Sequence, residues 1–295
     1  MMKPLDADRV SWAAQLACLL EVSAHKPGNV TPTVGFRDMQ FTDLVASAVA
    51  IGPAMGRVHT SSVGQAILEA IRDTRRFVAT NTNLGMVLLL VPLARAACTG
   101  HPDGFRPAVL NVLDKLTVDD ARHAFEAIRI ASPGGLGRSE TMDVRDTHPE
   151  GTLRDAMCEA RERDAVAREY ATCFEITFAI GCPTLADVWR RGGTLSDAIV
   201  QTALTVLARI PDTLIARKEG FETAQQVSKR AQRVLDAGGV FSQPGREAIE
   251  AFDLALRDDR HRLNPGTTAD LTTASIFVFL VEQELGRVQE LLHRW

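Results

Sequence analysis

Apolar residues recur at helical spacing along most of the chain. In the segment Ala7–Ala24, for example, Val10, Ala14 and Ala17 fall on one face of a helix. The same period predicts helices over residues 41–55, 62–79, 84–98, 117–131, 152–180, 194–210, 222–237, 244–256 and 271–285. Alternating runs of β-branched residues, which would predict strands, are absent. The pattern therefore predicts an all-α fold.

This helical pattern continues along the chain without a boundary. The sequence has no internal repeat of fixed period and no Gly/Ser-rich linker at which the composition changes. A chain of 295 residues is long enough to bury a large core. We therefore predict a single multi-helix globular domain over residues 1–295, with about ten to twelve helices.

Several helix starts carry a capping residue. Thr117 and Thr152 each stand three residues before an aspartate, which is the capping-box pattern, and Thr42 is a candidate cap for the segment that follows it. The last apolar segment carries Phe277 and Phe279. These two rings suit either the core or the interface of a homodimer.

Four polar breaks separate the apolar helices. The first runs from Glu21 through Lys26-Pro27-Gly28-Asn29 to Asp38, the second is Asn81-Thr82-Asn83-Leu84-Gly85, the third is the loop from Ser132 to Gly151, and the fourth is Asn264 to Leu271, with Asp212 and Arg217-Lys218 as further members. A loop as long as the third is typical of functional or disordered segments. Each break also fits ordinary turn and cap chemistry, because Asn, Gly, Pro and Thr are turn residues.

The fourth break has two interpretations. A Pro-Gly turn followed by a carboxylate at the start of a helix can hold an anion or a metal–anion complex, because backbone N–H groups point outward there. Thr267 and Asp270 also fit a capping box, which needs no ligand. Both interpretations can hold if Thr267 caps the helix while Asp270 faces a bound group.

Composition excludes several classes of function. The net charge is −4 without a basic stripe, and Tyr170 is the single tyrosine, so neither phosphate contacts nor base stacking indicate nucleic-acid binding. The five cysteines form no C-x-x-C and fit a reducing compartment. No signal-peptide or membrane-spanning segment is found. These observations predict a cytoplasmic protein whose partners are small molecules, with neither nucleic acid nor membrane.

Local motifs of known chemistry are absent. The sequence has no phosphate-binding loop, no H-E-x-x-H, no G-x-S-x-G and no G-x-G-x-x-G after a strand. The histidines are too scattered for a zinc site. From the residues alone, the prediction is a helical protein with a cleft for an anion or a Mg²⁺–phosphate complex.

The four breaks together resemble the triphosphoribosyl-dephospho-CoA synthase family. Members of that family carry, in this order, a P-K-P-G, an H-x-D-M, an N-T-H-K-G and an S-P-G-G-S-A-D-L segment. The matching residues here are Lys26, Pro27, Gly28, Asp38, Met39, Asn81, Thr82, Gly85, Pro265, Gly266, Ala269, Asp270 and Leu271. No single motif is specific to the family, but the order in which all of them occur between residues 21 and 280 is specific.

The resemblance implies an ATP-binding pentosyltransferase of cofactor biosynthesis. The expected reaction transfers the triphosphoribosyl group of ATP to 3′-dephospho-CoA or a related acceptor, with Mg²⁺ present and adenine released. Asp38 and Asp270 are then the candidate catalytic carboxylates and metal ligands. The residues expected to hold ATP are Lys26, Gly28, Asn29, Asn81, Thr82, Arg217, Asn264 and Gly266.

Some positions depart from the family pattern. Phe36 stands where the family has histidine, and Asn83 and Leu84 replace the His-Lys of N-T-H-K-G. These changes keep open a different acceptor, such as a pterin-cofactor intermediate of tetrahydromethanopterin biosynthesis that receives a ribosyl or phosphoribosyl group. Hydrolysis of such a compound, and a non-catalytic nucleotide-binding protein, are further alternatives.

Overall fold

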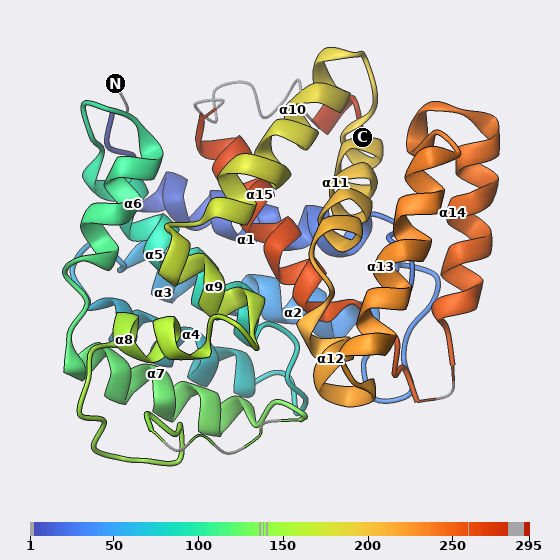
Figure 1. The fold of residues 1–295 in the computed structure, drawn as a ribbon. Coiled ribbons are helices and arrows are strands. Elements are labelled where there is room, and N and C mark those ends of the chain that lie inside the picture. Colours follow the sequence, from blue (N-terminus) through green and yellow to red (C-terminus); the bar gives the residue numbers. More distant parts are fainter. Residues whose placement is uncertain (1–2, 136, 138, 140, 259, 283–291) are drawn as a thin grey trace.

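The last long helix, α15 (Gly266–Glu282), forms the centre of the molecule. It runs through the middle of Figure 1 and packs against α1, α5, α9, α10, α11 and α12. It has no polar face, and its buried hydroxyls are satisfied within the helix: the hydroxyl groups of Thr272, Thr273 and Ser275 each donate to the carbonyl oxygen four residues earlier. An all-round buried helix is therefore possible despite its polar residues.

The computed structural model describes residues 3–135, 137, 139, 141–258, 260–282 and 292–295. The elements of the first half are α1 (Ala7–Ser23), α2 (Phe41–Ala50), α3 (Gly52–Gly56), α4 (Val63–Arg75), α5 (Leu84–Thr99), α6 (Phe105–Leu113), α7 (Val118–Ala131), α8 (Leu153–Ala160) and α9 (Ala165–Thr172). The helices α4 to α9 gather on one side of α15 (Figure 1).

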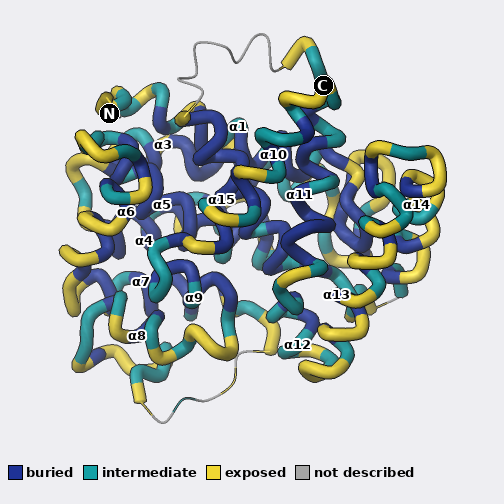
Figure 2. Tube along the Cα trace, turned by 45° about the horizontal axis from the view of Figure 1, so that its top comes forward, coloured by how far each residue is buried: buried dark blue, intermediate teal, exposed yellow. Residues whose placement is uncertain are grey.

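The second half supplies the opposite side. Its elements are a π-helical turn η1 (Thr177–Gly181), α10 (Cys182–Arg190), α11 (Leu195–Arg209), α12 (Thr213–Glu219), α13 (Phe221–Asp236), a 3₁₀ turn η2 (Gly239–Phe241), α14 (Gln243–Leu256) and α15. Figure 2 shows the consequence for burial: α1, α5 and α15 are mostly buried, while the peripheral helices carry the exposed residues.

The all-α prediction is confirmed, since the described residues contain helices and no strand. The helix count was too low, because fifteen α-helices are found in the described part. Two predicted helices are broken. Gly52 and Pro53 divide the segment 41–55 into α2 and α3. The segment 152–180 is interrupted twice, by residues 161–164 between α8 and α9 and by the left-handed residues Cys173 and Phe174. The extent of one domain over 1–295 stays a prediction.

The predicted caps are confirmed at two of three positions. Thr117 and Thr152 make capping boxes with aspartates three residues later, at the starts of α7 and α8. Thr42 does not cap α2: that helix begins one residue earlier, and its capping residue is Gln40, paired with Asp43. Phe277 and Phe279 lie in the core, so α15 does not present them to a partner.

The structure also bears on the membrane and cysteine predictions. Among the described helices, none is by itself long and apolar enough to cross a membrane; two sharply bent helix pairs would meet the length and composition only if joined. All five cysteines are free thiols. In the third break, the described residues between 132 and 151 form no helix. Arg138 and Glu140 of that loop lie outside the described residues.

Candidate active site

One large cavity collects the polar breaks predicted from the sequence. Its volume is about 910 Å³, comparable with small-molecule sites of roughly 300–1,000 Å³. Residues from all four breaks line it, among them Asn29, Asp38, Asn81, Ser139, Asn264 and Asp270. The breaks lie at the ends of α1, α5, α7 and α15. The fold therefore brings segments that are more than 240 residues apart in sequence, such as Asn29 and Asp270, to one cavity.

Most of the residues predicted for the site reach this cavity. Those that line it are Asn29, Asp38, Asn81, Thr82, Arg217, Asn264, Gly266 and Asp270. Lys26 and Gly28 do not belong to the lining. The roles assigned to these ten residues from the sequence stay predictions. Lys26 and Gly28, however, contact other parts of the protein and do not line the cavity.

Gly28 packs the first break against α14 and the fourth break. Its φ is +76°, a left-handed conformation that favours glycine, and a Cβ atom there would lie 2.9 Å from Leu256 and 3.0 Å from Pro265. Its N–H donates to the Asp253 carboxylate at 2.7 Å. Gly28 is thus needed for close packing of the first break on α14 and the fourth break.

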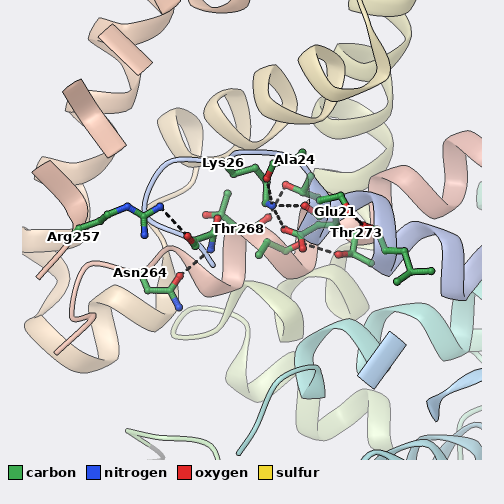
Figure 3. A network of polar contacts seen from close by, with 12 residues as sticks. Glu21, Ala24, Lys26, Arg257, Asn264, Thr268 and Thr273 are labelled. Carbon is green, nitrogen blue, oxygen red and sulfur yellow. Dashed lines mark hydrogen bonds and ion pairs between the residues drawn. The ribbon is translucent and has the colours of Figure 1, made fainter. Parts of the chain in front are cut away.

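Two asparagines join the same breaks at the cavity wall. The Asn29 amide nitrogen donates to the Asn264 side-chain oxygen at 2.8 Å (Figure 3). Arg257, itself paired with Asp253 at 2.7 Å, donates to the Asn29 carbonyl oxygen at 3.1 Å. This network fixes the orientation of both amides toward the cavity without using all of their hydrogen-bonding groups.

Lys26 is turned inward. Only 1% of the residue is exposed, and its Nζ lies 3.1 Å from Glu21 Oε1. Nζ donates to the backbone carbonyl oxygens of Glu21 and Ala24 (Figure 3). Glu21, unlike Lys26, lines the cavity. The sequence places both residues in the first break, but it assigned the ligand contact to the lysine and no role to the glutamate.

Asp270 extends from the second turn of α15 toward the first turn of α5. A Cβ atom on Gly85 would lie 2.0 Å from Asp270 Oδ2, so the absence of a side chain at Gly85 makes room for this carboxylate. Within the described residues, the Asp270 carboxylate accepts no hydrogen bond and makes no ion pair. Gly85 belongs to the second break and Asp270 to the fourth, so this contact packs the two breaks against each other.

The start of α15 differs from the predicted capping box. The helix begins at Gly266, which places Thr267 inside the first turn and not at the N-cap. The Thr268 N–H instead donates to Asp212 Oδ2 at 2.7 Å. Asp212 therefore already supplies a negative charge to this helix end, and the capping role predicted for Thr267 was wrong. Asp212 was noted in the sequence, but its contact with Thr268 could not be predicted, because the two residues are 56 positions apart.

Burial controls the ionisation of the carboxyl groups at this wall. It raises the pKa of the Glu21 carboxyl above its ordinary value, and the adjacent Lys26 opposes the rise. Burial, followed by the charges of Glu21, Asp212 and Asp164, raises the pKa of the Asp270 carboxyl well above its ordinary range. The charge of Lys26 thus favours the ionised form of Glu21, as the charge of Arg217 does for Asp270.

Cationic side chains line another part of the cavity. Arg217 Nη1 pairs with Asp164 Oδ2 at 2.7 Å, and Asp164 also caps α9. Further cations in the lining are Arg75, Arg163, Lys218 and Arg260. Apart from Arg217 and Lys218, sequence reasoning did not single them out, because they come from separate elements and no local motif connects them.

An aromatic contact closes one edge of the cavity. The rings of Phe36 and His261 stack with centroids 3.9 Å apart and planes 17° apart, and both residues line the cavity. The Arg37 N–H donates to His261 Nε2 at 3.2 Å, which puts the ring proton of neutral His261 on Nδ1. The position at which the sequence departs from the family pattern, Phe36, thus contacts a histidine from another loop.

The described residues contain no group of three or more His, Cys, Asp and Glu side chains arranged to hold a metal ion. Asp38 and Asp270 nevertheless provide oxygen donors at the cavity. Mg²⁺ is commonly held by one or two carboxylates together with phosphate oxygens of the substrate. The donor set therefore fits a metal that arrives with its nucleotide better than a permanently bound one.

Comparison with known proteins identifies the family. A family model described as ATP:dephospho-CoA triphosphoribosyl transferase (CitG) matches residues 7–289. The chain belongs to this family. The resemblance predicted from the four breaks is therefore confirmed, and the expected enzyme class, a pentosyltransferase, is the class of this family.

Similar proteins carry consistent names. A 2-(5''-triphosphoribosyl)-3'-dephosphocoenzyme-A synthase from Klebsiella pneumoniae is 25% identical over 301 residues, which cover 94% of this chain and 97% of the relative. A probable enzyme of the same name from Pseudomonas syringae pv. tomato is 34% identical over 126 residues, which cover 41% of this chain and 42% of the relative. That second match therefore spans less than half the length of its relative.

A solved structure supports the fold. A crystal structure from Archaeoglobus fulgidus that carries the name triphosphoribosyl-dephospho-CoA synthase aligns with a TM-score of 0.63 and 27% sequence identity. The alignment covers 81% of this chain and 98% of that one. The overall helical fold is thus shared with that structure.

Proposed function

We propose that this chain transfers the triphosphoribosyl group of ATP to a hydroxyl of 3′-dephospho-CoA or a related acceptor and releases adenine. The observation that carries the proposal is the convergence of Asn81, Asn264 and Asp270, from separate breaks, on one cavity of about 910 Å³. Membership of the CitG family and the names of similar proteins support the same reaction.

The charge distribution of the cavity suits ATP. Arg217 and the other cations offer positive charge to a triphosphate, while Asp38 and Asp270 would hold Mg²⁺. When bound, Mg²⁺ would neutralise part of the phosphate charge. Asn29 and Asn264, which are oriented by their mutual hydrogen bond, would contact sugar hydroxyls or phosphate oxygens.

The identity of the acceptor depends on another part of the wall. Leu84 replaces the lysine of the family pattern and is buried, and Asn83 donates to Thr74 Oγ1 at 3.0 Å inside the protein. This wall therefore lacks the cation and the imidazole of the N-T-H-K-G segment. That difference favours an acceptor with less negative charge at this position, such as the pterin intermediate predicted from the sequence, as the second candidate.

Adenine release tests the donor and the acceptor separately. Purified protein is incubated with ATP, Mg²⁺ and either dephospho-CoA or a pterin alcohol, and free adenine and the coupled product are measured by chromatography and mass spectrometry. We expect adenine only when ATP and an acceptor are both present. Turnover of a phosphoribosyl donor with ATP inert would instead support the alternative transferase, and ATP binding without any turnover would support a non-catalytic protein.

Substitutions at the two predicted carboxylates test their role. Asp38→Asn and Asp270→Asn are each expected to reduce adenine release at least about 100-fold, in the range of lost catalytic groups. Asp8→Asn is a matched control, because Asp8 is exposed on α1 and does not line the cavity. Unchanged release in both cavity variants would contradict the roles assigned to Asp38 and Asp270.

A further inference from the structure

Glu21 is a buried carboxylate with an unused acceptor. Only 3% of the residue is exposed, and it reaches the cavity from the end of α1. Its Oε1 atom accepts no hydrogen bond from the described residues. Oε1 is itself buried, and no hydrogen bond among the described residues reaches the rest of the carboxylate, although the residue lines the cavity. Because buried carboxylates in native proteins almost always have donors, this one calls for a ligand or a reacting group.

Lys26 compensates the charge of Glu21 without using that acceptor. Its Nζ lies 3.1 Å from Oε1, but at an angle that does not form a hydrogen bond. Nζ donates two of its three protons to the backbone carbonyl oxygens of Glu21 and Ala24 (Figure 3). The lysine is thus held by the backbone in a position where it stabilises an ionised Glu21 without occupying the whole carboxylate.

The remaining titratable neighbours act in the opposite sense. Asp270, on α15, and Glu21 repel one another when both are ionised. Cys18, one turn earlier on α1, has a pKa raised by burial and then by Glu21, and it stays a neutral thiol. Two cations oppose these effects: Lys26 is paired with Glu21, and the charge of Arg217 favours the ionised form of Asp270.

We propose that Glu21 is a further catalytic residue that accepts the proton of the attacking hydroxyl, and that Lys26 is the residue that positions it. This assignment rests on the proposed transfer. The acceptor oxygen forms a bond to C1′ of the ribose, and its proton passes to the Glu21 carboxylate. The C1′–N9 bond breaks, and adenine leaves with its electron pair and takes a proton from water. Glu21 then returns its proton to water.

The direct substitution must be separated from an effect on folding. Glu21→Gln alone leaves Lys26 buried without a counter-charge, which is strongly destabilising. The double variant Glu21→Gln/Lys26→Met removes both charges at nearly constant volume and keeps the fold testable. We expect its kcat to fall about 10²- to 10⁴-fold, which is the usual contribution of a general base. The KM for ATP should change less than about threefold, because Glu21 does not hold the triphosphate.

A conservative variant distinguishes a proton acceptor from a packing residue. Glu21→Asp keeps Lys26 paired with a carboxylate, set back by one methylene. We expect its kcat to exceed that of the double variant at least about tenfold. Glu169→Gln is the matched control, because Glu169 is equally buried, lies outside the cavity and has donors on both carboxylate oxygens. Its kcat is expected to stay within about twofold of wild type.

The outcomes separate this inference from the proposed function. If wild type releases adenine and the double variant keeps more than about one third of its kcat, Glu21 is not the base, while the transferase assignment stands. Glu21 is likewise not the base if the double variant only raises the KM for ATP. The same holds if Glu21→Asp is as slow as the double variant. Absence of adenine release by wild type with every acceptor overturns the proposed function and, with it, the role of Glu21.

Discussion

Asp212 and Glu21 both lie buried near the start of α15, yet their surroundings are opposite. Asp212 Oδ1 accepts from the N–H groups of Leu214 and Ile215 at 2.9 and 3.1 Å, and Oδ2 accepts from the N–H and hydroxyl of Thr268 at 2.7 and 2.8 Å. Glu21 Oε1 lies 3.1 Å from Lys26 Nζ but accepts no hydrogen bond from the described residues. One carboxylate is completely used by the protein, and the other faces the cavity.

This difference underlies the two roles that we propose, a structural one for Asp212 and a catalytic one for Glu21. Burial alone does not, because Asp212 and Glu21 are 2% and 3% exposed. Burial also raises the pKa of both carboxyl groups. What differs is whether the hydrogen-bond acceptors are satisfied within the protein. Asp212 joins α12 to α15 and thereby supports the wall from which Asp270 extends.

Replacing the satisfied carboxylate should give the largest effect on stability. Asp212→Ala leaves four donors without their acceptor, and we expect the free energy of unfolding to fall by about 3–5 kcal/mol. Asp212→Asn, which keeps one acceptor oxygen, should cost about half as much. Urea unfolding followed by circular dichroism measures both. A loss in Asp212→Ala no larger than that of Asp8→Asn would contradict the structural role.

A second satisfied carboxylate predicts a pH dependence. Burial raises the pKa of Glu169 to about 7, although Thr177 and Ile176 donate hydrogen bonds to it. The folded protein therefore binds a proton that the unfolded chain has already lost between about pH 4.5 and 7, so stability must fall as pH rises through this window. The shift corresponds to about 3 kcal/mol.

Glu169→Gln cannot ionise and should remove that part of the pH dependence. Unfolding free energies at pH 5 and pH 8 are compared for wild type and variant. We expect the difference between the two pH values to become smaller in Glu169→Gln, by up to about 3 kcal/mol. The raised pKa values of Asp212 and Asp270 act in the same direction and leave a residual slope. An equal pH dependence in both proteins would show that Glu169 does not titrate in this range.

The contact between Gly85 and Asp270 gives a smaller effect that links stability to the cavity. In Gly85→Ala, the new Cβ would lie 2.0 Å from Asp270 Oδ2 and must displace it. We expect a loss of about 1–2 kcal/mol and reduced adenine release. Gly56→Ala is the control, since the nearest atom to its new Cβ would be 4.0 Å away. If Asp270→Ala does not relieve the cost of Gly85→Ala, the contact is not its cause.

The exposed carboxylate at the same cavity should give the smallest effect on stability. Asp38 is exposed, and no hydrogen bond or ion pair involves its side chain within the described residues. Asp38→Asn is expected to change the unfolding free energy by less than about 0.5 kcal/mol. Calorimetric titration should nevertheless show weaker binding of ATP with Mg²⁺. Equal affinities for wild type and variant would remove Asp38 from the binding site.

Hydrophobic period and capping residues predicted the helical class and many helix starts. Thr117 and Thr152 act through neighbours three residues away, so their effect is visible in sequence. The break between α2 and α3 was missed, because the apolar period continues across Gly52 and Pro53. The order of the four breaks was sufficient to identify the CitG family.

The chemistry within the breaks was decided by the tertiary structure. Lys26 was predicted at a ligand, but the end of α1 turns it inward toward Glu21. The cap of α15 comes from Asp212, and the space for Asp270 comes from Gly85 on α5. Sequence spacing reports which residues share a turn, because helical contacts are local. It cannot report which carboxylate lacks a donor, because that depends on groups brought together from distant segments.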